Sequence, residues 1–130
     1  KHTILLALTS NKGAADFQFY GKDNSLYQEV ISKALQWQNS ENLMFVIGAT
    51  QPEYFETIRR LAPHHFFLVP GVGAQGGNLD AICRYGMNEN VGLIINSSRG
   101  IIYASQQDDF AKAARNAAKK MQEEMAAYLG

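Results

Sequence analysis

Four short apolar runs divide the chain, and each is followed by a polar or glycine-rich stretch and then by a helical pattern. The runs are ILLAL (4–8), LMFVIG (43–48), FFLV (66–69) and VGLIIN (91–96). Each is continuous rather than alternating, which is typical of strands that are buried on both faces, as in a parallel sheet. The pattern therefore predicts an α/β protein.

Apolar residues recur at helical spacing after each of these runs. We expect helices at about 24–38, 52–62, 78–85 and 108–129. Pro52 suits the first turn of the second helix, and Asn78 and Gly86 suit the N-cap and C-cap of the third. The last helix is rich in alanine, and its expected buried stripe comprises Phe110, Ala114, Ala117, Ala118, Met121 and Met125.

The resulting order is βαβαβαβα, which is the local pattern of a (β/α)8 TIM barrel. Right-handed crossovers would place all the helices on one face of a sheet whose strands are added in sequence. A whole barrel needs about 250 residues, so a chain of 130 residues supplies about four of the eight βα units. Half a barrel leaves two strand edges and an apolar inner face uncovered, and the chain lacks an initiator Met. We therefore interpret residues 1–130 as one domain segment and expect four further units upstream.

Active sites of TIM barrels lie on the loops that follow the strands, and the last two loops frequently bind phosphate. The third loop holds four glycines that allow the backbone to approach an anion closely, and Gln75 adds an amide at its tip. The fourth loop adds Arg99, whose planar fork matches phosphate geometry. Sequence alone also permits Arg99 to pair with a surface carboxylate. The glycines are Gly71, Gly73, Gly76 and Gly77.

The third loop also matches G-x-G-x-x-G, the fingerprint of dinucleotide-binding sites. Such a site places the fingerprint in the first βα turn and an acidic residue at the end of the next strand. Here the next strand ends in Asn96–Arg99 without a carboxylate, and Glu89 precedes that strand. The spacing therefore favours a monophosphate held by two neighbouring loops.

Composition narrows the function classes further. The formal net charge is zero, which gives no electrostatic reason to expect a nucleic-acid partner, and no apolar run is long enough to cross a membrane. Cys83 is the single cysteine, so the chain can form no internal disulfide and no cysteine-based zinc cluster, which suits the cytoplasm. We expect Cys83 to be a buried filler, and His64 and His65 to lie at the amino end of the third strand, away from the site.

The four loop sequences are similar to those of a known enzyme family. TSNKGAADFQ, FVIGATQPE, FFLVPGVGAQGGNLD and GLIINSSRGIIYAS together are similar to the C-terminal half of the orotidine 5'-phosphate decarboxylase family, and most resemble its longer bacterial subgroup. The resemblance spans nearly the whole chain and keeps the order of all four loops. It implies a cytoplasmic homodimeric TIM-barrel enzyme that converts orotidine 5'-phosphate to UMP, in pyrimidine biosynthesis, without cofactor or metal.

The resemblance also implies roles for individual residues. Gln75 would hold the substrate phosphate together with Arg99 and the backbone of the neighbouring Ser98 and Gly100, and Ser10 would meet the pyrimidine base. The closing loop would be shaped by Pro70, Gly71, Gly73 and Gly76.

One part of the family pattern is missing. The family's catalytic Asp and Lys network is built around D-x-K-x-x-D, and this element does not occur here. The resemblance therefore implies no catalytic residue in this chain and places the network upstream. Two alternatives stay open: another sugar-phosphate enzyme with the same barrel, and a non-catalytic half barrel that binds phosphate.

Overall fold

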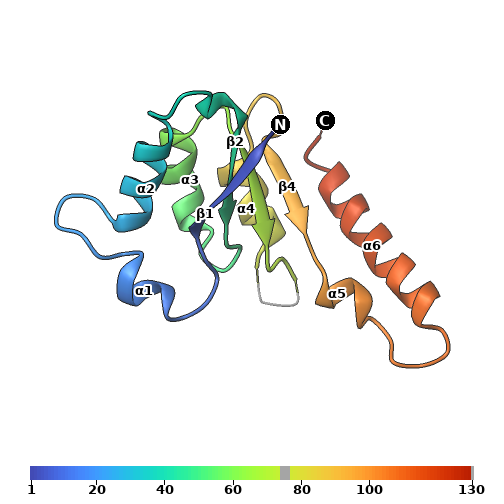
Figure 1. Cartoon of the computed structure of the whole chain (residues 1–130). Helices are drawn as coiled ribbons and strands as arrows, with labels where there is room; N and C mark the ends of the chain where they lie inside the picture. Colours follow the sequence, from blue (N-terminus) through green and yellow to red (C-terminus); the bar gives the residue numbers. More distant parts are fainter. Residues whose placement is uncertain (74–76, 130) are drawn as a thin grey trace.

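The computed structural model describes residues 1–73 and 77–129 (Figure 1). The four apolar runs form one parallel sheet in the order β1-β2-β3-β4, which confirms the predicted strands and their sequential arrangement. The strands are β1 (Thr3–Leu8), β2 (Leu43–Ile47), β3 (Phe66–Pro70) and β4 (Leu93–Asn96). The chain therefore has the α/β architecture of half a (β/α)8 barrel.

Helices follow the strands as predicted, and three of the four are shorter than the sequence suggested. The longer helices are α2 (Leu26–Ala34), α3 (Glu53–Leu61), α4 (Leu79–Gly86) and α6 (Phe110–Ala126). Three short elements were not predicted, because one turn is too brief to show a periodic pattern. These are α1 (Ala14–Phe17), the 3-10 helix η1 (Ser40–Asn42) and α5 (Arg99–Ile102), the last within a stretch expected to be a loop.

Helix α4 shows how local sequence sets an element's bounds. The Asn78 side chain accepts the Ala81 N–H at 3.2 Å, which confirms Asn78 as the N-cap. Gly86 is instead the last helical residue, so its predicted role as C-cap was wrong. A Cβ at Gly86 would lie 2.7 Å from the Phe55 ring and 3.1 Å from Leu93, so a glycine is needed here for close packing.

The core lies between the sheet and its helices. Phe45 of β2 is paired in register with Phe67 of β3, and both rings are fully buried. Phe55 of α3 packs edge-on against Phe67, with ring centroids 6.4 Å apart. Burial of each large apolar side chain contributes about 1.5–3 kcal/mol, so this layer fixes the helices on one face of the sheet.

The opposite face of the sheet is apolar but uncovered in this chain. Leu6, Val46, Leu68 and Ile94 form one row across all four strands. Leu6 is 60% exposed and Ile94 is 41% exposed, as expected for half a barrel, although the continuous apolar runs taken alone predicted burial on both faces. The row has the composition of a barrel interior without the strands that would close it.

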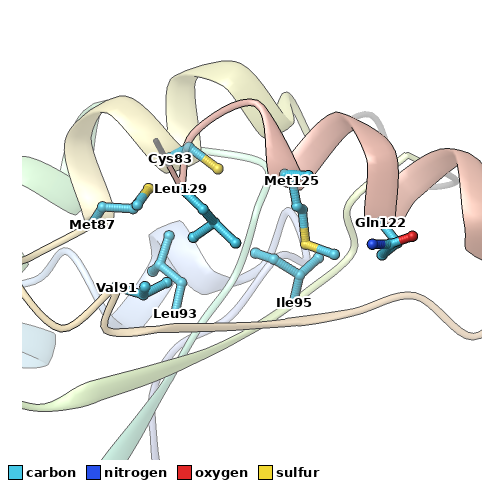
Figure 2. Close-up of a pocket in the computed structure, with 9 residues that line it drawn as sticks. Cys83, Met87, Val91, Leu93, Ile95, Gln122, Met125 and Leu129 are labelled. Atoms are coloured by element: carbon cyan, nitrogen blue, oxygen red, sulfur yellow. The ribbon is translucent and has the colours of Figure 1, made fainter.

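Helix α6 is packed more loosely than its sequence suggested. None of its residues is buried, and Phe110 is 60% exposed, so the expected buried stripe was wrong. Met121 still packs against the core. An apolar cavity of about 170 Å³ separates α6 from α4 and β4, and Figure 2 shows the side chains that converge on it. Cys83 lines this cavity and is buried, as predicted, and burial raises the pKa of its thiol.

One guanidinium group binds several backbone carbonyl groups near the amino ends of β3 and β4. Arg59 of α3 lies over the Phe67 ring, 3.7 Å from its centroid. It donates hydrogen bonds to the carbonyl oxygens of Ala62, Pro63, His65, Gly86 and Gly92. Burial lowers the pKa of Arg59 to about 10. His65 lies in this region, as predicted, with Nε2 3.1 Å from the Ser40 carbonyl oxygen.

No helix in the described ranges combines the length and the apolar character required to span a membrane.

Candidate phosphate and base site

The carboxyl ends of β3 and β4 border a polar cavity of about 230 Å³. Pro70 and Asn96, the last residues of the two strands, are paired in register, so the loops that follow them start side by side. The cavity is lined by Pro70, Gly71, Val72, Asn96, Ser97, Ser98 and Arg99. The structure thus brings four of the predicted site residues together: Pro70, Gly71, Ser98 and Arg99.

The loop after β3 folds back on itself. Gly71 and Gly73 have φ angles of 91° and 75°, in the left-handed region that favours glycine. The loop is closed by a hydrogen bond from the Gly73 N–H to the Gly77 carbonyl oxygen at 3.2 Å, and by one from the Gly77 N–H to Gly71 at 3.3 Å. A Cβ at Gly77 would lie 2.5 Å from the Ala49 Cβ, so this end of the loop also requires glycine. Gln75 and Gly76 lie outside the described residues.

The loop after β4 turns directly into α5. The Ser98 carbonyl oxygen accepts the N–H groups of Ile101 and Ile102 at 3.1 and 2.8 Å, which starts the helix at Arg99. The N–H groups of a first helical turn have no acceptor within the helix, so those of Arg99 and Gly100 are available to an anion. The Ser98 hydroxyl donates to the Asn96 carboxamide oxygen at 3.3 Å.

Arg99 is exposed beside this cavity. Among the described residues, the ion pairs involve other side chains, so pairing of Arg99 with a surface carboxylate has no support in the structure. Gly73 and Gly100 do not line the same cavity as Arg99. They border an adjoining hollow of about 310 Å³, which shares Ser97 with the first. The two hollows are therefore continuous, with Arg99 in the first and Lys120 beside Glu124 in the second.

Ser10 lies at the same end of the sheet but after β1, the opposite edge strand. Its hydroxyl oxygen is buried and has no hydrogen-bond partner among the residues that the structure describes. The backbone around it is held in place, because the Thr50 hydroxyl donates to the Ser10 carbonyl oxygen at 3.3 Å. Gly48 packs so closely on Ser10 that a Cβ there would lie 2.6 Å from the Ser10 nitrogen. A rigidly held, unsatisfied hydroxyl of this kind can accept or donate a hydrogen bond to a ligand.

Sequence reasoning missed three polar residues in these loops. Gln18 holds the loop after β1, since its side chain accepts the Thr9 N–H and donates to the Thr9 hydroxyl, both at 2.9 Å. The Gln51 carboxamide oxygen, near the start of α3, is buried and has no partner within the described ranges. Asn96 lines the phosphate cavity. Each lies at the end of an apolar run or in the stretch that follows one, but polar residues are common at such positions.

The described parts of the chain hold no group of three His, Cys, Asp or Glu side chains arranged to bind a metal ion. The groups with shifted pKa values, such as Arg59 and Cys83, lie away from the cavity. The cavity and Ser10 can therefore bind and orient a ligand through hydrogen bonds and one positive charge.

Comparison with known proteins places the chain in a family. Residues 1–116 match the sequence model of the orotidine 5'-phosphate decarboxylase / HUMPS family. The chain is 59% identical to an orotidine 5'-phosphate decarboxylase of Christiangramia forsetii, over 99% of this chain and 48% of that protein. An orotidine 5'-phosphate decarboxylase of Flavobacterium johnsoniae is 56% identical over the same shares.

Comparison with solved structures agrees with this family assignment. The structure of Leishmania donovani OMP decarboxylase matches 98% of this chain and 48% of its own, with a TM-score of 0.83 and 36% identity. The chain thus spans about half the length of the curated relatives that it matches.

Proposed function

Since the chain belongs to the orotidine 5'-phosphate decarboxylase / HUMPS family, we propose that it is the C-terminal half of a decarboxylase that converts orotidine 5'-phosphate to UMP, the last step of de novo pyrimidine biosynthesis. In this proposal residues 1–130 hold the substrate phosphate and part of the pyrimidine base. The observation that carries the proposal is the cavity where Arg99 meets the loop after β3.

The phosphate assignment is supported by complementary charge and by donors on adjacent loops. Arg99 presents a guanidinium fork without a carboxylate partner among the described residues, and Ser98 and Gly100 flank it. The loop from Pro70 to Gly77 would close over the phosphate, with Gln75 as its amide donor. Its left-handed glycines allow the backbone to turn tightly beside the cavity.

The base assignment is supported by Ser10. A buried hydroxyl without a partner is costly, and such an atom is typically satisfied by water or ligand. In the proposal this hydroxyl bonds the amide edge of the pyrimidine. Because Ser10 and Arg99 follow opposite edge strands, a nucleotide lying across the carboxyl ends of the strands would contact both.

The chemical step would be carried by residues outside this chain. The uncovered apolar face and the open edges of β1 and β4 fit an upstream half barrel that closes the sheet. That half would supply the Asp and Lys network, in which a lysine protonates the carbon from which CO₂ departs. The proposed enzyme is a cytoplasmic homodimer that uses no cofactor and no metal. Binding energy from the remote phosphate would organise the reacting centre.

The test compares Arg99→Ala with Arg115→Ala in the intact protein. Arg115 is an equally exposed arginine on α6, away from the cavity, and serves as the matched control. Loss of a charged, bidentate contact should weaken UMP binding by about 2–3 kcal/mol, or roughly 30- to 150-fold, in calorimetric titrations. Decarboxylation, followed by ultraviolet absorbance, should lose kcat/KM to a similar or greater extent.

Equal UMP affinity in both variants would contradict the phosphate assignment. Competition experiments address the alternative of another sugar-phosphate enzyme. UMP should displace a bound nucleotide, whereas ribulose 5-phosphate should not. The opposite result would assign the same phosphate cavity to a different reaction.

A further inference from the structure

Asn96 occupies an unusual place in the sheet. Along β4 the side chains of Leu93 and Ile95 pack against the core, so Ile94 and Asn96 lie on the uncovered face. Ile94 continues an apolar row across the sheet, whereas Asn96 places a carboxamide at the carboxyl end of the strand. This is also where Asn96 borders the phosphate cavity together with Arg99.

The hydrogen bond from Ser98 favours one orientation of this carboxamide. The Ser98 hydroxyl donates to the Asn96 oxygen at 3.3 Å, so the amide nitrogen and its two hydrogens are directed away from Ser98. Within the described ranges, no hydrogen bond uses that nitrogen as a donor. The Ser98 hydroxyl has a single hydrogen, which is already engaged.

The oxygens of a phosphate monoester accept hydrogen bonds, so the protein must supply N–H or O–H donors. The bond between Ser98 and Asn96 determines which side chains of the cavity have such donors available. Arg99 and Asn96 offer free N–H groups in the cavity, while the Ser98 side chain orients Asn96. We infer that Asn96 is a further substrate-contact residue, whose amide donates to the phosphate end of the nucleotide beside Arg99. The inference rests on the function proposed above and adds a residue that determines specificity for the phosphorylated ligand.

The test measures UMP and uridine binding to Asn96→Asp and Asn96→Ser in the intact protein, by calorimetric titration. Asn96→Asp keeps the shape of the side chain but replaces the donor with a negative charge, so UMP affinity should fall at least about thirtyfold. Asn96→Ser removes the amide and should cost about five- to tenfold. Uridine lacks the phosphate, and its affinity should change less than about threefold in both variants. Asn116→Asp, at an exposed site on α6, is the matched control.

Ser98→Ala provides an independent readout. If Ser98 acts by orienting Asn96, its removal should weaken UMP binding in the wild type but have little further effect in Asn96→Ser. Thermal unfolding followed by circular dichroism would confirm that all the variants are folded.

The outcomes separate the two proposals. If Arg99→Ala weakens UMP binding but the Asn96 variants do not, or if they weaken UMP and uridine equally, the inference about Asn96 is wrong. If Arg99→Ala also leaves UMP binding unchanged, the proposed function itself fails.

Discussion

Replacement of Arg59 by methionine should destabilise the protein without altering its ligand affinity. Methionine keeps much of the length of the side chain but removes every N–H donor. The Gly86 carbonyl oxygen accepts from Nε at 2.8 Å and from Nη2 at 2.6 Å, and the His65 carbonyl oxygen accepts from Nη1 at 2.7 Å. These are the shortest of the bonds from Arg59, so their loss should dominate.

Two of the other carbonyl oxygens keep a hydrogen bond when Arg59 is replaced. Gly92 also accepts from the Phe67 N–H at 2.9 Å, and Pro63 also accepts from the Asn88 amide at 2.8 Å. A hydrogen bond to a charged group contributes about 1.5–3 kcal/mol, and contact with an aromatic face adds about 1 kcal/mol. Burial of the guanidinium is unfavourable and lowers the pKa of Arg59 to about 10. Removal of this buried charge therefore offsets part of the lost stability. The net loss should be about 3 kcal/mol.

Urea denaturation of the intact protein measures this difference directly. Arg60→Met is the matched control, because Arg60 is 72% exposed and pairs only with Glu56, at 3.3 Å. That change should cost less than about 0.5 kcal/mol. The stability cost of Arg59→Lys should lie between those of Arg59→Met and Arg60→Met, since one ammonium cannot reach all the carbonyl groups. A cost for Arg59→Met within about 1 kcal/mol of the control would refute the reasoning. UMP affinity should be unchanged, because Arg59 lies at the amino ends of the strands.

Two further predictions concern the core and the base site. Burial, with a smaller contribution from Asp80, raises the pKa of Cys83 above its ordinary value of 9.0, so the folded state retains a proton that the unfolded state loses. The stability that depends on the neutral thiol is therefore complete below pH 9 and declines above it. The difference in unfolding free energy between wild type and Cys83→Ala should shrink as the pH rises above about 9. A constant difference would contradict this account. Gly48→Ala would bring a Cβ to 2.6 Å from the Ser10 nitrogen and 2.9 Å from the Thr9 carbonyl carbon, and should weaken both uridine and UMP binding by displacing Ser10. Unchanged uridine affinity in Gly48→Ala would count against Ser10 as a base contact.

The strand order and the main helices could be predicted because their causes are local. Continuous apolar runs and caps such as Asn78 are visible in the sequence itself. The exposure of Phe110 could not be predicted, because a helical stripe indicates which side is apolar but not how closely a partner packs on it. Gly86 was misinterpreted for a related reason, since its need for a small side chain comes from Phe55 and Leu93, which are distant in sequence.

At the candidate site, too, some residues could be predicted from the sequence and others could not. Arg99 and the glycines could be identified from residue type and position after a strand, and the structure places Arg99 in a cavity with Pro70 and Gly71. Asn96 could not be distinguished from any other polar residue at the end of a strand. Its significance depends on the face of β4 that it occupies and on the bond from Ser98, and both are properties of the three-dimensional arrangement.

The simple succession of strands in this sheet also has a kinetic consequence. Each strand pairs only with the strands that precede and follow it along the chain, so each pairing closes a loop of one βα unit. Loop-closure entropy rises with the length of the loop, and low contact order accelerates folding. The sheet can therefore grow one strand at a time from any adjacent pair. In the proposed half-barrel arrangement, the slow step of folding would be the pairing of the open edges of β1 and β4 with the strands of the upstream half.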